Sequence, residues 1–325
     1  MRIVAETPMS CIMSGARRGA RPGDWIPHPA MKVFVTGSSS HFAAALLPQL
    51  CASPEVERVT GIDLKPSRFT HAKFHATQLD IRSSRLEHVL AGHDALVHLA
   101  GIVLAGGKTH DEMFDINVNG GHSVFHTARQ SGVRRLIHLS SAAVYGGGVH
   151  LSEHAPLDPA PACLHAVHQA HLEKLLEIEF PECTRLRPHI LLGPHCRREL
   201  KRLLRLPCYV RLPEPQPLLQ CVHEDDVARA VLLALGHDVR GAFNLAVEDS
   251  FSIRDVVRQR HLVAVPLPPF AARAGLDAAR RWFGWKGDPA WLEGLTRTLL
   301  VNCRRAAVEL GWRSTHSVAS VLAQT

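Results

Sequence analysis

Apolar residues near position 31 follow a pattern that predicts a strand, a turn and a helix in immediate succession. Lys32 to Val35 form a buried strand in this prediction, a tight turn follows at Gly37, and a helix begins at about His41. A helix that follows a strand through a turn of small residues presents unpaired N–H groups, which attract an anion such as a phosphate. The spacing is close to G-x-x-G-x-x-G, but Ser40 and Ala43 stand at the second and third glycine positions. The segment predicts a phosphate-binding loop with one of its three glycines.

Five more strands are predicted further along the chain, separated by stretches with apolar residues at helical spacing. The run from Ala95 to Ala100 is almost continuously apolar, which is typical of a strand buried on both faces of a parallel sheet. The other predicted strands are Arg58 to Asp63, Phe74 to Leu79, Arg135 to Leu139 and Thr184 to Arg187, and the main helical stretches are Leu86 to Leu90, Asp111 to Gln130 and the segment from Cys163. Strands that alternate with helices predict an α/β fold.

An acidic residue ends the second predicted strand. Asp63 lies about two dozen residues after Gly37, where it can accept hydrogen bonds from an adenosine ribose. Lys65 and Arg68 leave room for a 2′-phosphate, whereas Asp63 itself favours NAD over NADP. The alternative interpretation is that Asp63 is a solvated turn residue. The predicted phosphate-binding loop that precedes Asp63 favours the interpretation as a ribose contact.

The composition is that of an ordinary globular protein with a positive net charge. The 325 residues are 46% hydrophobic and 21% charged, and the net charge is +7 at pH 7. Lys and Arg are scattered, with local clusters only near the N-terminus and at 197–205, and no aromatic-basic platform accompanies them. We therefore expect an anionic small molecule as partner and no nucleic acid.

Cysteine usage and hydropathy predict a cytoplasmic protein. The eight cysteines are dispersed and form no C-x-x-C pair, so we expect reduced thiols. No apolar run reaches about 18 residues, which predicts no spanning helix and no membrane partner. Residues 1–30 hold four prolines and four arginines and end at Met31, where the first strand begins. We interpret them as a disordered extension or a start codon placed too early, with a targeting segment as the alternative.

The most specific motif of the chain follows the fifth predicted strand and reads SSAAVYG. The other motifs are TGSSSHFA at 36–43, HLAG at 98–101, NVNG at 117–120, LRPHILLGP at 186–194, VHEDDVARAV at 222–231, GAFNLA at 241–246 and VELGW at 308–312. Through their order and spacing the chain resembles an extended short-chain dehydrogenase/reductase of the NAD-dependent epimerase/dehydratase family. This family includes nucleotide-sugar 4-epimerases and dehydratases.

The resemblance implies a Rossmann-type, doubly wound parallel sheet with a smaller C-terminal substrate-binding domain. The dinucleotide-binding domain would span 31–194 with returning segments near 219–247, and the smaller domain would lie mainly in 195–325. The implied cofactor is NAD, with NADP as the alternative. The positions that match cofactor-binding motifs are Gly37, Ser39, Ser40, His41, Phe42, Asp63, Asp80, Ile81, Leu99, Ala100, Gly101 and Asn117.

The catalytic pattern of the family is incomplete in this sequence. Enzymes of the family use a Ser or Thr, a Tyr and, four residues after the Tyr, a Lys that lowers the pKa of the Tyr. Ser141 matches the Ser/Thr, and aligning Glu173 with the glutamate common in that helix places His165 and Gln169 at the Tyr and Lys positions. Neither of the two tyrosines in the chain is followed four residues later by a lysine. An ordinary tyrosine–lysine mechanism is therefore excluded.

Two interpretations of this departure are open. In one, His165 replaces the tyrosine as acid/base, since a histidine with a pKa of ~6.5 needs no neighbouring cation at neutral pH, and Gln169 hydrogen-bonds a ribose hydroxyl. In the other, the protein binds a dinucleotide or sugar nucleotide as a sensor or scaffold without redox chemistry. Ser40 favours the second interpretation if its position needs φ > 0, because a non-glycine residue there costs about 1 kcal/mol and crowds the pyrophosphate.

The basic segment at 197–205 is the candidate anion site of the smaller domain. Arg198 and Arg202 share a helix face, which suits the nucleotide-sugar diphosphate that this domain holds in the family. A solvated basic face is the alternative. Three histidines between His165 and His171 lie on one helix but do not converge on one ion, so we expect no metal.

Two helical stretches, 111–130 and 165–179, carry apolar residues at helical intervals. In the family the two equivalent helices pair with those of a second subunit as a four-helix bundle, so the resemblance implies a homodimer. The residues concerned are Phe114, Val118, Val124, Leu172, Leu175 and Leu176.

Overall fold

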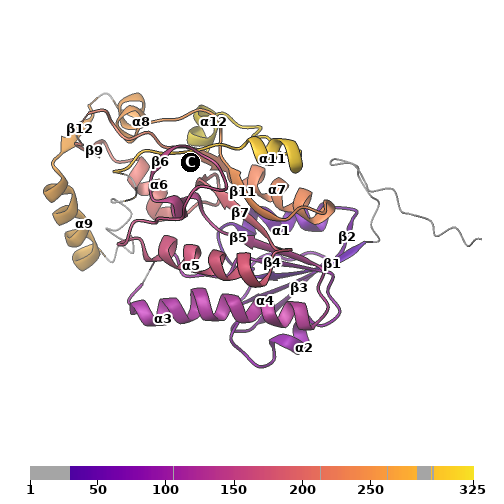
Figure 1. Cartoon of the computed structure of the whole chain (residues 1–325). Helices are drawn as coiled ribbons and strands as arrows, with labels where there is room; N and C mark the ends of the chain where they lie inside the picture. Colours follow the sequence, from indigo (N-terminus) through magenta and orange to yellow (C-terminus); the bar gives the residue numbers. More distant parts are fainter. Residues whose placement is uncertain (1–29, 105, 213, 262, 284–293, 295) are drawn as a thin grey trace, which may run out of the picture.

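The computed structural model describes residues 30–104, 106–212, 214–261, 263–283, 294 and 296–325 (Figure 1). The N-terminal segment 1–30, interpreted above as an extension, lies outside these residues except for Ala30. The core of the described chain is a seven-stranded parallel sheet in the order β11-β7-β5-β4-β1-β2-β3. Its strands are β1 (Met31–Thr36), β2 (Val56–Asp63), β3 (Phe74–Gln78), β4 (Ala95–His98), β5 (Arg135–Leu139), β7 (Thr184–Pro188) and β11 (Gly241–Leu245). The predicted doubly wound parallel sheet is confirmed.

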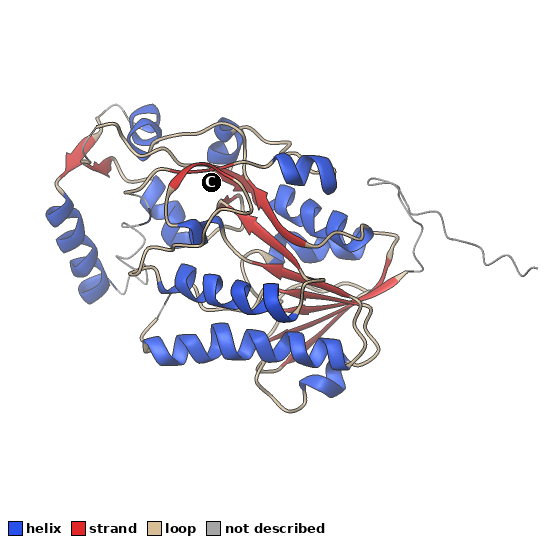
Figure 2. Ribbon diagram, in the orientation of Figure 1, coloured by secondary structure: helices blue, strands red, loops and turns tan. Residues whose placement is uncertain are grey.

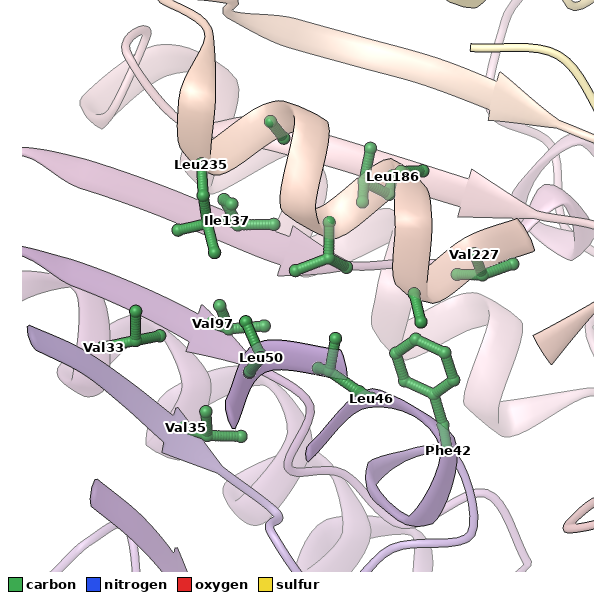
Figure 3. Close-up of a cluster of buried hydrophobic side chains, with 14 of the residues drawn as sticks. Val33, Val35, Phe42, Leu46, Leu50, Val97, Ile137, Leu186, Val227 and Leu235 are labelled. Atoms are coloured by element: carbon green, nitrogen blue, oxygen red, sulfur yellow. The ribbon is translucent and has the colours of Figure 1, made fainter. Parts of the chain in front are cut away.

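Helices cover both faces of this sheet (Figure 2), and strands such as β1 and β4 are buried on both sides. Val33 and Val35 of β1 pack into the cluster that contains α1 (Ala43–Ala52) and α7 (Glu224–Gly236), which Figure 3 draws. Phe34, between them, points to the opposite face and packs with α4 (Gly121–Gln130) and α5 (Leu164–Glu179). Successive side chains of a strand alternate between faces, and here both faces are apolar, which explains the uninterrupted apolar runs.

The predicted helix over Asp111 to Gln130 is continuous but has three parts. It begins as α3 (His110–Phe114), widens into a π-helical turn (Asp115–Gly120) and continues as α4. Thr109 caps its start in a reciprocal pair of hydrogen bonds with Glu112. The wide turn carries Asn117, whose side chain is buried. π-Helical turns of this kind often occur at functional sites.

The C-terminal part of the chain adds short elements around a second apolar cluster. These elements are β8 (Ile190–Leu192), α6 (Arg198–Leu204), β9 (Cys208–Val210), β10 (Cys221–His223), α8 (Ile253–Arg260), β12 (Val265–Leu267), α9 (Pro269–Phe283), β13 (Leu299–Val301) and α12 (Val318–Ala323). β10 pairs with β8, β12 with β9, and β13 with β6 (Gly148–Leu151). In Figure 1, α9 lies at the end of the molecule away from the sheet.

One C-terminal segment returns to the large sheet. The helices α11 (Arg304–Glu309) and α7 share the cluster on the first sheet face, and Trp312 is buried there. The indole N–H of Trp312 donates to the Asp226 carbonyl at 2.7 Å. No helix in the described part of the chain combines the length and apolar character that a bilayer-crossing segment needs.

Candidate functional site

The loop after β1 lies against the loop after β4. Gly37 has φ +70°, and a Cβ atom on it would stand 2.8 Å from the backbone nitrogen of Ala100, so only glycine fits. The N–H groups of Leu99 and Ala100 donate to Thr36 Oγ1 at 3.2 and 3.3 Å. The strand order reverses between these two loops, and open α/β sheets bind ligands in the crevice at that point.

Ser40 fits the loop without backbone strain. Among the non-glycine residues that the structure describes, only His150 has a positive φ. The strain considered for Ser40 therefore does not arise, and that part of the argument against cofactor binding is wrong. Ser40 Oγ accepts a hydrogen bond from the N–H of Ala43 at 3.2 Å, where α1 begins. The hydroxyl thus occupies one N–H group that a phosphate would otherwise contact.

Asp63 ends β2 beside the phosphate-binding loop. Its carboxylate accepts hydrogen bonds from the N–H groups of Ser39 at 3.0 Å and Lys65 at 2.9 Å. A carboxylate has further lone pairs, so Asp63 can still accept from ribose hydroxyls. His41 is exposed at the loop, whereas Phe42 is buried in the core and offers a ligand only its backbone.

Asp80 and Ile81 are engaged in the protein's own contacts. The Asp80 carboxylate accepts hydrogen bonds from Arg82, which also pairs with Asp115 at 2.7 Å. The hydrogen bonds from Arg82 hold the pKa of Asp80 below its usual range. The Ile81 side chain is buried. A cofactor at this point would have to share Asp80 with Arg82.

Asn117 fixes the loop that follows Gly101. Its Oδ1 accepts from the N–H of Ile102 at 2.6 Å, and its Nδ2 donates to the Ile102 carbonyl at 2.9 Å. Leu99 and Ala100 are half-buried and Gly101 is exposed at the same edge. Asn117 therefore positions this edge, and the backbone of the loop is the part that a ligand can approach.

Helix α5 carries His165 and Gln169 on one face, four residues apart. Burial, followed by the positive charge of Arg197, lowers the pKa of His165 to about 4, so the ring is neutral at pH 7. His165 Nδ1 is buried without a hydrogen-bond partner. Gln169 Oε1 accepts a hydrogen bond at 2.7 Å from the Nε2–H group of His138, a buried residue of β5. The Gln169 carbonyl is thus directed to the sheet.

The SSAAVYG motif forms a 3₁₀ helix (Ala142–Tyr145), which Ser141 caps by accepting a backbone hydrogen bond at 3.2 Å. The Tyr145 hydroxyl is buried, accepts from Arg187 at 2.6 Å and donates to Asn244 at 2.8 Å. Burial raises the pKa of Tyr145. The hydroxyl of this tyrosine is thus held by two contacts within the protein.

A buried charge network, absent from the sequence predictions, joins the motif to α5 and β7. Glu173 accepts from Arg187 Nε at 2.9 and 3.0 Å and also from the Ser140 hydroxyl. Burial alone would raise the pKa of Glu173, but the hydrogen bonds and charge of Arg187 lower it. The available signal was an arginine inside an apolar strand, which needs a buried acidic partner.

Arg197, just before α6, is a half-buried cation that sequence reasoning did not single out. Burial is the main cause that lowers the pKa of His41 and of His165, and the positive charge of Arg197 is the second cause at both. The guanidinium therefore lies near both the loop after β1 and the start of α5. Burial also lowers the pKa of Arg197 itself. Across the described ranges its guanidinium makes no hydrogen bond and no ion pair within 4 Å. Such a group can receive an anion.

Comparison with known proteins identifies the family. The model of the NAD dependent epimerase/dehydratase family matches residues 33–246, more than half of the chain. The chain belongs to this family.

The relatives of this epimerase/dehydratase family member include proteins with different names. Sterol demethylase protein B of Methylococcus capsulatus is 32% identical over 120 residues, which cover 36% of each chain. UDP-glucose 4-epimerase of Mycolicibacterium smegmatis is 28% identical over 181 residues, which cover 50% of this chain and 57% of that protein. The solved structure of MoeE5 in complex with UDP-glucuronic acid and NAD has a TM-score of 0.71 at 21% identity, covering 90% of this chain and 97% of that chain, and shows the shared fold.

The C-terminal part of this family member encloses a cavity of about 470 Å³. α6, β9, α8, β12 and α9 contribute its walls. Arg202 lies at its edge and is exposed, whereas Arg198 does not line it and instead acts on His41. The anion site predicted at these two arginines stays a prediction.

The histidines considered for metal binding lie on α5. Within His165–His171, the His168 ring contacts Asn117 at 3.3 Å. A different group, His122, His126 and Glu179, has ligand atoms within 4.8 Å of one another. Both histidine Nε2 atoms lie at hydrogen-bond distance from Glu179 Oε2.

Proposed function

We propose that the protein binds NAD in the crevice between the loops after β1 and β4. The family is NAD-dependent, and the chain's own residues fit the cofactor. Gly37 keeps the loop compact, and Asp63 stands where ribose hydroxyls would lie. Arg197 supplies a cation for the diphosphate; it has no hydrogen bond or close ion pair with the described residues, and only the charge of Glu199 acts on it. The Arg197 observation carries the proposal, because a half-buried guanidinium gains most from an anionic partner. The Asp63 carboxylate would repel a 2′-phosphate, which favours NAD over NADP.

We infer that binding, as a sensor or scaffold, is the main activity. Bound NAD supplies hydride transfer, which the family couples to proton transfer at a tyrosine. With a pKa of about 4, His165 holds a transferred proton poorly at pH 7, and the Gln169 carbonyl is engaged by His138. Altered catalysis is the second candidate, favoured by the unpartnered Nδ1 of His165, which could accept a proton from a ligand hydroxyl that Ser141 orients.

The names of the relatives support two different classes of second ligand. The names of the UDP-glucose 4-epimerase and of the MoeE5 complex support a nucleotide sugar or a similar anionic small molecule. The name of the sterol demethylase protein supports an apolar ligand instead.

A turnover assay separates the two candidates. UDP-glucose and UDP-glucuronic acid are incubated with NAD and the wild-type protein, His165→Phe, or His171→Phe as an exposed control on the same helix. The binding proposal expects no product from any of the three, although NAD raises the melting temperature of all three. Turnover that only His165→Phe abolishes supports the histidine base. Turnover that His165→Phe leaves intact contradicts both candidates.

We also propose a cytoplasmic homodimer. The described cysteines are free thiols, which supports a reducing compartment. Phe114 and Leu175 are partly exposed and Ile178 is 79% exposed along α3–α4 and α5, which run side by side (Figure 1). The other residues predicted for the interface are buried in this chain's own core (Val118, Val124, Leu172 and Leu176).

A further inference from the structure

The cavity in the C-terminal part has the size of a small-molecule site. Its volume of about 470 Å³ falls within the ~300–1,000 Å³ typical of such sites. Segments far apart in the sequence form its walls, and Figure 1 shows them grouped at the end of the molecule beyond the sheet.

The wall of the cavity is overwhelmingly apolar. Leu200 and Leu204 of α6 face Phe251, Leu267 and Leu276 from the other elements, and further aliphatic residues complete the wall. The polar side chains among the lining residues are Arg202, Tyr209, Gln216, Arg254 and Thr296. A ligand in this space would therefore contact hydrocarbon over most of its surface.

Few polar groups of the wall are open to a ligand. Arg254 forms an ion pair with Glu214, and Gln216 donates to the Leu212 carbonyl at 2.9 Å. Arg202 is exposed, and the Tyr209 hydroxyl makes no hydrogen bond to the described residues, so it can bond one oxygen atom of a ligand. A diphosphate or a uracil ring inside this wall would lose most of its hydration for few matching hydrogen bonds, which is unfavourable.

Exposed apolar side chains also occur on the elements that enclose the cavity. Leu206 lines the cavity and is 43% exposed. Val265 of β12 and Phe270 of α9 do not line it and are 44% and 76% exposed.

The cavity adjoins the candidate NAD site. Leu192 lines the cavity and belongs to the same cluster as Ala142 and Tyr145 of the SSAAVYG motif and Ala170 of α5. Arg197 near the phosphate-binding loop and the cavity residue Leu200 lie three positions apart in the chain. The cavity is thus placed where the second ligand of an NAD-binding member of this fold would lie.

We propose that this cavity binds an uncharged, largely apolar molecule of the isoprenoid or polycyclic class that carries an alcohol or ketone oxygen. This class differs from the UDP sugars of the solved structures because the wall offers hydrocarbon in place of anion and base contacts. The inference rests on the proposed function only in assuming that NAD binds next to the cavity.

Ala279→Phe tests the proposal by filling the cavity, since Ala279 lines it from α9. Ala278→Phe is the matched control, because Ala278 is exposed on the same helix and does not line the cavity. Gly275→Leu is a second filling variant, since an added Cβ atom at Gly275 meets no atom within 4 Å. Dehydroergosterol and farnesol are the apolar probes and UDP-glucose is the polar probe. NAD-induced thermal shifts are measured on the same samples.

We expect saturable binding of at least one apolar probe to the wild type and to Ala278→Phe, and at least tenfold weaker binding to Ala279→Phe and Gly275→Leu. The NAD shift should be the same in all four proteins. The proposal is overturned if neither apolar probe binds saturably, if filling the cavity leaves apolar binding unchanged, or if filling it weakens UDP-glucose binding instead. Cavity-dependent apolar binding without any NAD shift would support this inference and contradict the proposed function.

Discussion

At the scale of single residues, the candidate cofactor site depends on one acid that the sequence identifies and one cation that it does not. Asp63 could be predicted because its distance from the phosphate-binding loop follows from the length of one helix and one strand. Arg197 could not, because its importance comes from half-burial without a partner, which depends on how the rest of the chain surrounds it. The buried partner of Arg187, Glu173, likewise lies in another element.

Replacing Arg197 with Gln should weaken NAD binding by about tenfold to a hundredfold, since a hydrogen bond to a charged group contributes about 1.5–3 kcal/mol. Arg258→Gln is the control, because Arg258 is an exposed arginine of α8. Isothermal titration with NAD measures both variants. Equal affinity in the two would remove Arg197 from the diphosphate site.

Tyr145→Phe should lower the free energy of unfolding by about 1–3 kcal/mol, because it leaves Asn244 Oδ1 and an N–H of Arg187 without their partner in a buried network. Tyr209→Phe is the control, since the Tyr209 hydroxyl makes no hydrogen bond to any residue in the described ranges. Urea unfolding gives both values. A loss no larger than that of Tyr209→Phe would argue against a structural role for the Tyr145 hydroxyl.

At the scale of elements, the apolar pattern predicts strands and long helices well and short amphipathic segments poorly. Every strand predicted from the sequence lies in the central sheet. Strands buried on both faces, such as β1 and β4, leave a clear apolar run, whereas the edge strand β3 is mostly exposed. The basic segment at 197–205 does form a helix, α6. Whether its arginines bind one anion stays a prediction, since residue spacing on one helix does not reveal what stands opposite each side chain.

Several buried histidines sit in or beside these elements and should make the protein sensitive to acid. At the start of β8, the His189 Nε2–H donates to the Leu299 carbonyl at 2.9 Å and Nδ1 accepts from the Ile190 N–H at 2.8 Å, a pattern that only the neutral ring satisfies. Burial lowers the pKa of His189 to about 4, below the ~6.5 of an unfolded chain. Between these two values the unfolded state binds more protons, so stability falls as pH falls.

We expect His189 alone to contribute a loss of about 2 kcal/mol in the free energy of unfolding between pH 7 and pH 5. Urea unfolding at both pH values should show a smaller pH-dependent loss in His189→Gln than in the wild type. His88→Gln, at an exposed position, should behave as the wild type does. Identical pH dependence in all three proteins would contradict the neutral-ring arrangement.

At the scale of the whole molecule, the sequence predicts the three-layer architecture but not the cavity. The sheet and its covering helices follow from local patterns repeated along the chain. The cavity is formed by side chains between Ile190 and Thr296 that meet only after folding. Four of the six apolar residues predicted for a dimer interface are buried in this chain's own core. Helical spacing alone does not distinguish a helix face packed on the sheet from one packed on a partner.

Light scattering after size exclusion should give about twice the 35.7 kDa of one chain if the homodimer forms. Ile178→Glu, on α5, should shift the population toward the monomer because it places a charge within the apolar part of the proposed interface. Ile178→Leu should leave the mass unchanged. A mass near 35.7 kDa for the wild type would contradict the dimer.

The most direct test of the central claim is an isothermal titration of the purified protein with NAD, alongside Asp63→Ala. The account predicts saturable binding of one NAD per chain, weakened at least tenfold by Asp63→Ala because the ribose hydroxyls lose their acceptor. Wild-type protein that shows no heat of binding and no NAD-induced thermal shift would contradict it.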